Sequence, residues 1–119
     1  MIIGALYGCN KFTTEDFKGT EWGITTDPVK VKWEEGTMER VSTHSIRFID
    51  SLRCIKKDIY NFSIPEHNGS ATSNGIYEIL NNEIKITFAY YYIILSPKGD
   101  ILELKESDLK QDFIYLKKI

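Results

Sequence analysis

The thiols and imidazoles of this chain are few, and their spacing limits the chemistry that they can do. They belong to Cys9, Cys54, His44 and His67. A structural zinc site takes about four nitrogen or sulfur ligands, so a site here needs every one of them, and we expect no metal. The two cysteines could form one disulfide or stay free. Cys54 and His44 could form a nucleophile–base pair, but a core cysteine and a surface histidine are the favoured interpretation.

Two pairs of carboxylates are close enough in sequence to suggest acid–base catalysis. They are Glu34 with Glu35, and Asp108 with Asp112. Glycoside hydrolysis needs two carboxylates across a cleft. Neighbouring residues of a strand point to opposite faces, so Glu34 and Glu35 do not converge there, and surface charge is the preferred interpretation of both pairs. We therefore expect a protein that is not an enzyme and that uses no cofactor.

The composition predicts the kind of element that positions these residues. The chain has 119 residues, among them 17 isoleucines but only three alanines and one glutamine. Val, Ile, Thr, Phe, Tyr and Trp favour strands and total 44 residues, whereas a helical bundle is built largely from good helix formers such as Ala and Gln. A chain of this length fits one domain. We expect a single, mostly-β domain.

The charge argues against a nucleic-acid-binding function. Fifteen basic residues face 17 acidic ones, for a net charge of −2, whereas a nucleic-acid-binding domain needs a clustered excess of Lys and Arg. The local basic groups are interpreted as solvated faces or chain ends. These groups are Lys30 with Lys32, Arg53 with Lys56 and Lys57, and Lys117 with Lys118.

Alternation and turn residues predict the strands. Residues 29–33 alternate strictly, which is typical of a strand with one wet face, and Asn81-Asn82 between two apolar runs predicts a hairpin. Residues 90–95 predict a strand covered on both faces, and residues 67–75 the longest loop. The whole pattern predicts an all-β fold, a small antiparallel β-barrel or sandwich of about 8–10 strands, with at most a short helical turn at 13–17. The isoleucines predicted to face inward are Ile46, Ile64, Ile79, Ile84 and Ile86.

The first twelve residues resemble the anchor segment of bacterial lipoproteins. Leu6-Tyr7-Gly8-Cys9 is similar to the lipobox, in which the peptide is cut before a cysteine that then carries a lipid. The resemblance implies that residues 1–12 are a truncated signal and anchor segment, with lipidation at Cys9 and a location in the cell envelope. The alternative is a first strand with Cys9 as an ordinary core thiol, and then a cytoplasmic protein.

Residues 13–119 resemble the small lipocalin-like domains of bacteria. Gly19-Thr20-Glu21-Trp22 is similar to the family's opening element, whose tryptophan plugs one end of a barrel. Residues 75–86 resemble its mid-barrel hairpin, and residues 100–117 its closing strands. The resemblance implies a single lipocalin-like barrel over residues 13–119 that binds a small apolar ligand.

The expected function is that of a non-enzymatic binding domain of the cell envelope, in contact with the membrane only through Cys9. The competing hypothesis is a soluble cytoplasmic interaction domain of the inhibitor or immunity type, with an unknown protein partner. A small barrel is either filled by side chains or holds one small ligand. The candidate residues of the lumen are Trp22, Trp33, Phe48, Tyr60, Phe62, Tyr77, Phe88, Tyr90 and Tyr92.

Overall fold

The computed structural model describes residues 12–119, and most of its regular structure is β-strand. The predicted helical turn is present as α2 (Thr14–Phe17), and a short 3₁₀ turn, η1 (Pro65–His67), follows the fourth strand. The strands are β1 (Glu21–Thr25), β2 (Val29–Trp33), β3 (Gly36–Phe48), β4 (Arg53–Phe62), β5 (Gly69–Leu80), β6 (Glu83–Thr87), β7 (Tyr92–Lys98), β8 (Ile101–Ser107) and β9 (Tyr115–Lys118).

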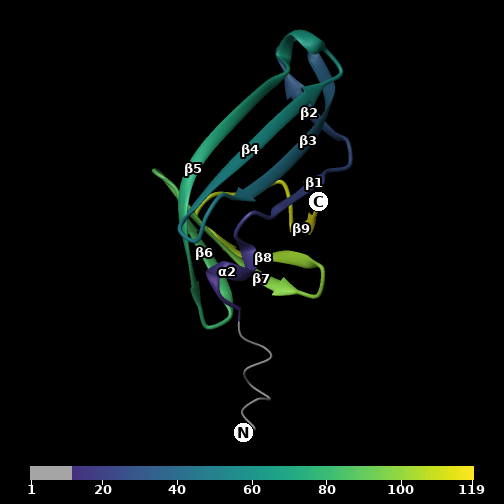
Figure 1. Ribbon diagram of the computed structural model, residues 1–119. Coiled ribbons are helices and arrows are strands. Elements are labelled where there is room, and N and C mark those ends of the chain that lie inside the picture. The colour runs from purple at the N-terminus through teal and green to yellow at the C-terminus, as the bar shows by residue number, and fades with distance from the viewer. Residues whose placement is uncertain (1–11) are drawn as a thin grey trace, which may run out of the picture.

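The strands form one antiparallel sheet that closes on itself (Figure 1). Their order is β1-β9-β8-β7-β6-β5-β4-β3-β2, and β1 also pairs with β3. Because of this additional pairing, eight strands form a closed barrel, namely β1 and the seven strands from β3 through β9. Strand β2 lies outside this ring. The predicted all-β fold with a small antiparallel barrel is therefore confirmed.

Strand β3 pairs with two different strands along the same edge. Its C-terminal part, 43–47, pairs with β1, and its N-terminal part, 36–40, pairs with β2. The ends of β3, β4 and β5 that lie beyond β1 therefore project from the barrel, as Figure 1 shows. We call this projection, residues 29–42 and 59–70, the wing.

The predicted hairpin at residues 81–82 is confirmed by its backbone. Asn81 and Asn82 have φ angles of 52° and 64°, and asparagine enters this left-handed region more readily than most residues. A two-residue hairpin turn of this kind needs positive φ at both positions. The turn sets the register in which Tyr77 faces Ile86.

Side chains fill the interior of the closed barrel. They alternate along the strands, as a half-buried strand requires, and each contributes roughly 1.5–3 kcal/mol of stability when fully buried. Ile79 is partly buried against this core, and Ile64 lies beyond β4 and is partly exposed. The largest fully buried apolar side chains are Ile46, Phe48, Ile84, Ile86, Ile93, Leu95, Leu102 and Leu116.

Helix α2 packs against the end of the barrel opposite the wing (Figure 1). The ring of Phe17 is buried there, with its centroid 5.5 Å from that of Phe48 and 6.3 Å from that of Trp22. The hydroxyl of Tyr77 lies 3.2 Å from the carbonyl oxygen of Thr14 and 2.5 Å from that of Asp50, the nearer acceptor of its proton. These contacts hold the helix in place and bury Trp22, the tryptophan of the family-like opening.

Two segments differ from the prediction. The expected loop at 67–75 is mostly strand, because β5 begins at Gly69 and pairs with β4 throughout Arg53–Tyr60. Its small polar residues do not favour a strand by themselves, so the pairing with β4 decides its conformation. The run at 90–95 enters the sheet only at Tyr92. Tyr90 lies in the preceding connection with 94% of its surface exposed.

Gly75 is required by the ring that lies on it. A Cβ atom at this position falls 2.9 Å from two ring carbons of Phe88, which itself stacks on Tyr91 with centroids 4.7 Å apart. We expect Gly75→Ala to lower the free energy of unfolding by about 1–3 kcal/mol, the usual cost of overpacking. Urea unfolding measures this loss.

The matched control lies on the same strand. A Cβ at Gly69 has no neighbour within 4 Å, so Gly69→Ala is expected to change stability by no more than about 0.5 kcal/mol. Equal unfolding midpoints for the two variants contradict the packing argument.

Candidate functional site

The inner face of the sheet changes from apolar to polar where the barrel meets the wing. On β3 the inward side chains are, from the core outward, Ile46, His44, Ser42 and Arg40. On β4 the apolar Cys54 is followed on the same face by the polar Lys56 and Asp58. The register places His44 opposite Asp58 and Ser42 opposite Tyr60. The polar side chains of the two strands therefore meet in one place above the core.

A buried ion cluster forms the floor of this region. Lys56, Asp58 and His44 have only 3%, 5% and 2% of their surfaces exposed. The Lys56 Nζ lies 2.8 and 2.7 Å from the two Asp58 oxygens, and His44 Nδ1 lies 2.6 Å from Oδ1. The rings of Tyr91 and Phe113 lie on the ammonium, each with its centroid 5.9 Å from Nζ.

The cluster keeps Asp58 ionised. Burial raises the pKa of this carboxyl, but the hydrogen bonds from His44 and Lys56 lower it, and together with the positive charge of Lys56 they hold the pKa below 3.8. Charge-assisted hydrogen bonds favour the ionised form in this way. The floor is thus a fixed internal salt bridge rather than a pair of neutral groups.

Two predictions about these side chains are wrong. Lys56 was expected on a solvated face and His44 on the surface, yet both are buried. Arg53 and Lys57 do lie on the wet face; Lys56 takes the opposite one because successive strand residues alternate. Burial of its charge is tolerated because Asp58, two residues along and therefore on the same face, pairs with it.

Asp112 reaches this region from the connection between β8 and β9. Its Oδ2 atom lies 2.9 Å from Arg40 Nη2, 3.5 Å from Ser42 Oγ and 4.0 Å from His44 Nε2. The next residue, Phe113, is buried, with its ring centroid 5.1 Å from that of His44. Among the described residues, Arg40 Nε and His44 Nε2 are buried without a hydrogen-bond partner.

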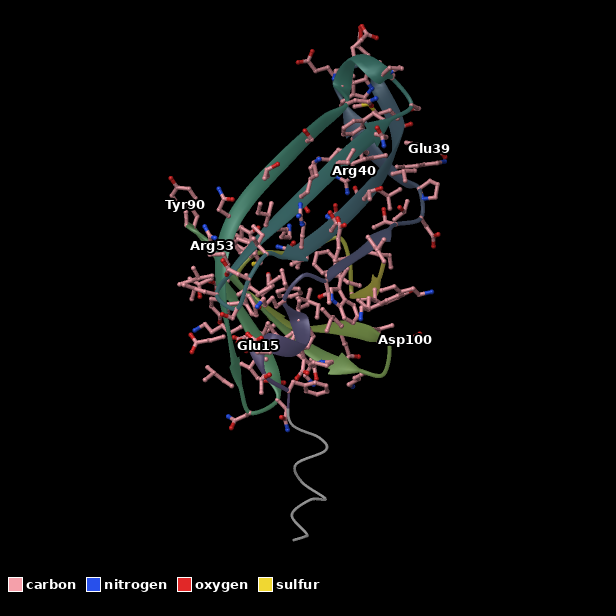
Figure 2. All side chains as sticks on the ribbon, viewed as in Figure 1. Glu15, Glu39, Arg40, Arg53, Tyr90 and Asp100 are labelled. Carbon is pink, nitrogen blue, oxygen red and sulfur yellow. The ribbon has the colours of Figure 1, made fainter. Side chains whose placement is uncertain are left out.

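A cleft opens above this cluster, on the inner side of the wing. Its volume is about 320 Å³. The guanidinium of Arg40 lies over the ring of Tyr60, 5.7 Å from its centroid, and the Trp33 and His67 rings are in edge contact at 4.7 Å. Figure 2 shows Arg40 far from Glu15 of α2, toward the wing. The cleft is lined by Arg40, Tyr60, Phe62, His67, Gly69 and Asp112.

The predicted lumen residues fall into three groups. Four of them, Trp22, Phe48, Tyr77 and Phe88, are packed in the core of the closed barrel. Tyr60 and Phe62 line the cleft, and Trp33 is partly buried beside it against His67.

Tyr90 and Tyr92 face away from the lumen, contrary to the prediction. Ile93 and Leu95 occupy the inward positions of β7, so alternation directs Tyr92 outward. There its hydroxyl donates to Glu106, and Lys85 Nζ lies 4.9 Å from the centroid of its ring.

The remaining chemistry-bearing candidates do not assemble a catalytic site in the described part of the chain. Burial raises the pKa of the Cys54 thiol to about 12, so it stays protonated, and His44 Nδ1 is engaged by Asp58. Glu34 and Glu35 are both exposed at the turn between β2 and β3. Within residues 12–119 no group of three or more His, Cys, Asp or Glu side chains could hold a metal ion. Cys9 lies outside the described residues, and its lipidation stays a prediction.

No family model, curated protein or solved structure matches the chain. None of the helices in residues 12–119 is long and apolar enough to span a membrane.

The buried ion pair predicts an asymmetry between two lysine substitutions. Lys56→Met leaves the Asp58 carboxylate buried without its ammonium, which is expected to cost about 3–5 kcal/mol of unfolding free energy. Lys98→Met breaks an ion pair of similar length, 2.9 Å between Lys98 Nζ and Glu103 Oε1, on the surface. It is expected to leave the free energy of unfolding nearly unchanged, because water screens exposed pairs. Urea unfolding at neutral pH compares the two.

A pH series gives the same experiment a second readout. Because the pKa of folded Asp58 lies below the ordinary aspartate value of 3.8, the stability that this group contributes is present above about pH 4 and is lost as the pH falls below it. Lys56→Met removes one of the groups that lower this pKa, so the acid loss should shrink in that variant. Equal neutral-pH losses for the two lysine variants, or parallel acid profiles for Lys56→Met and the wild type, contradict the assignment.

Proposed function

We propose that this protein is a non-enzymatic binding domain whose small ligand occupies the cleft between the wing and the β8–β9 connection. The observation that carries the proposal is a hollow of about 320 Å³ with aromatic walls and convergent polar groups. Small-molecule sites are concave, mostly apolar and supplied with a few placed polar groups, in volumes from about 300 Å³ upward. The resemblance to lipocalin-like domains is consistent with this use of the barrel.

The shape of the interior favours the open end for the ligand. The sequence predicted a small apolar ligand within the barrel, but Phe48, Tyr77 and Phe88 occupy the space below the ion cluster. The cleft instead combines the rings of Tyr60 and Phe62 with the charges above the floor. It suits a ligand with an apolar or aromatic body and one polar end.

A lipid anchor at Cys9 is compatible with this arrangement and forms part of the proposal. The described chain begins beside α2, at the end of the barrel opposite the wing (Figures 1 and 2). An anchor attached through the preceding residues therefore leaves the cleft on the side away from the membrane. The domain would then bind its ligand at the outer end of a tethered barrel.

The cleft can be blocked without touching the core. Gly69 lines it, and a side chain there has open space, so Gly69→Leu should fill it. We expect the neutral fluorescent probe N-phenyl-1-naphthylamine to bind the wild-type protein at a ratio of one to one. Its affinity for Gly69→Leu should be lower by about tenfold or more, because the leucine side chain occupies the space in which the probe makes its contacts. A fluorescence titration measures both.

The control is the neighbouring Ser70→Leu, which adds a similar side chain on the opposite face of the strand. It should bind the probe like the wild-type protein. A wild-type protein that does not bind the probe, or equal affinities in the two leucine variants, counts against the cleft.

A second proposal is that the chain pairs with a second copy of itself through the edge of β5. Residues 69–75 of β5 pair with β4 on one side, and among the described residues no strand pairs with their other side. Their sequence, GSATSNG, carries no charge, whereas the edge strand β2 carries Lys30 and Lys32, a usual protection of edges.

A second copy of the chain fits this edge. In a two-fold antiparallel pairing each β5 meets its own counterpart, and uncharged side chains do so without repulsion. We expect sedimentation velocity to show a concentration-dependent dimer that Thr72→Lys abolishes, because an edge lysine opposes pairing. A wild-type protein that stays monomeric over the whole concentration series rules this proposal out.

A further inference from the structure

Three polar side chains on one strand surround a carboxylate that comes from far along the chain. Arg40, Ser42 and His44 occupy successive inward positions of β3, and the Oδ2 atom of Asp112 lies 2.9, 3.5 and 4.0 Å from their nearest polar atoms. The contact of Arg40 with Asp112 spans 72 residues. The inner face of β3 is thus arranged around one carboxylate group.

Asp112 satisfies this arrangement only in part. Arg40 Nε, a donor, is buried without a hydrogen-bond partner in residues 12–119 although Nη2 of the same guanidinium is paired with Asp112. Buried polar atoms without partners are costly. A carboxylate that is not tied to the backbone at this point can present both of its oxygens to a guanidinium in the two-pronged geometry that arginine prefers.

The charges of the region specify what could replace Asp112. Lys56 and Asp58 neutralise one another in the floor, and Arg40 is neutralised by Asp112. Departure of the Asp112 side chain leaves one positive charge beside the cleft. One negative charge restores the balance, whereas a dianion such as a phosphate monoester exceeds it.

Asp112 can leave without opening the fold. Its side chain is already 34% exposed and sits in the connection between β8 and β9, outside the strands. Phe113, which is buried against His44, can keep the connection in place while the carboxylate turns toward water.

We propose that Asp112 occupies the place of a ligand's carboxylate, and that the ligand of the cleft is a small carboxylic acid with an aromatic or apolar body. This inference rests on the proposed function, because the body of the acid lies between Tyr60, Phe62 and His67 in the cleft. The acid exchanges with Asp112 on Arg40, so the chain's own aspartate competes with the ligand. No covalent bond changes in this exchange.

The test uses two probes of equal size that differ in charge, phenylacetate and phenylacetamide. Asp112→Asn keeps the shape of the side chain but removes the competing charge. We expect isothermal titration calorimetry to show about tenfold or greater tightening for phenylacetate, as expected when a charged hydrogen-bond competitor is removed, and no change for phenylacetamide. Asp100→Asn, an equal change of net charge in the exposed turn between β7 and β8, should leave both affinities as in the wild-type protein.

A second variant and a spectroscopic readout locate the carboxylate. Arg40→Gln should abolish the preference for phenylacetate over phenylacetamide while circular dichroism still shows the folded sheet. Addition of phenylacetate to Asp112→Asn should shift the ring nitrogen resonances of His44 in NMR spectra. The resonances of Asp100→Asn should respond as those of the wild-type protein do.

The outcomes separate this inference from the proposed function. Equal phenylacetate affinity in Asp112→Asn and the wild-type protein, equal gains for acid and amide, or no phenylacetate binding by either protein overturns the carboxylate site. The cleft itself still stands in those cases if N-phenyl-1-naphthylamine binds the wild-type protein and not Gly69→Leu. Failure of that neutral probe as well overturns both.

Discussion

The architecture depends on an inequality of length between two paired strands. β1 has five residues and β3 has thirteen, so the strand that closes the barrel can cover less than half of its partner. The remainder of β3 takes β2 as a neighbour and carries the ends of β4 and β5 out with it. The edge of β3 that β1 does not cover would leave its backbone groups unpaired. Pairing of this part of β3 with β2 satisfies them and forms the wing. The cleft exists because the wing overhangs the mouth of the barrel.

The ion cluster marks the boundary between the two parts of the interior. Below it the side chains are apolar and close-packed, which is the state of an ordinary core. Above it, β3 and β4 keep the same inward alternation but carry Arg40, Ser42 and Tyr60 toward the cleft. Charges at this depth are retained only when they are paired, and Asp58 pairs with both Lys56 and His44. A rigid, polar floor is therefore built into the same two strands that line the candidate site.

The sequence predicts the local features of this fold and misses those set by distant strands. Alternation identifies β2, and the pair Asn81-Asn82 identifies a hairpin, because both depend on neighbours in the chain. The spacing of Lys56 and Asp58 places the two on one face of a strand, but it does not predict burial, because lysine is usually exposed.

Other features follow only from the tertiary structure. The burial of His44 depends on its register with Asp58 in another strand, and the position of Asp112 depends on a connection without regular structure. The outward direction of Tyr92 depends on which apolar side chains of β7 point inward.

The pairing that closes the barrel affects the order of folding. Strand β1 meets β9 at Trp22 and Lys118, a contact of very high sequence separation, and such contacts form slowly because a long loop must close first. Until β9 is in place, β1 and β8 each present an open edge, so a ribosome-bound chain that ends within β8 has neither a closed barrel nor the Asp112 that completes its mouth.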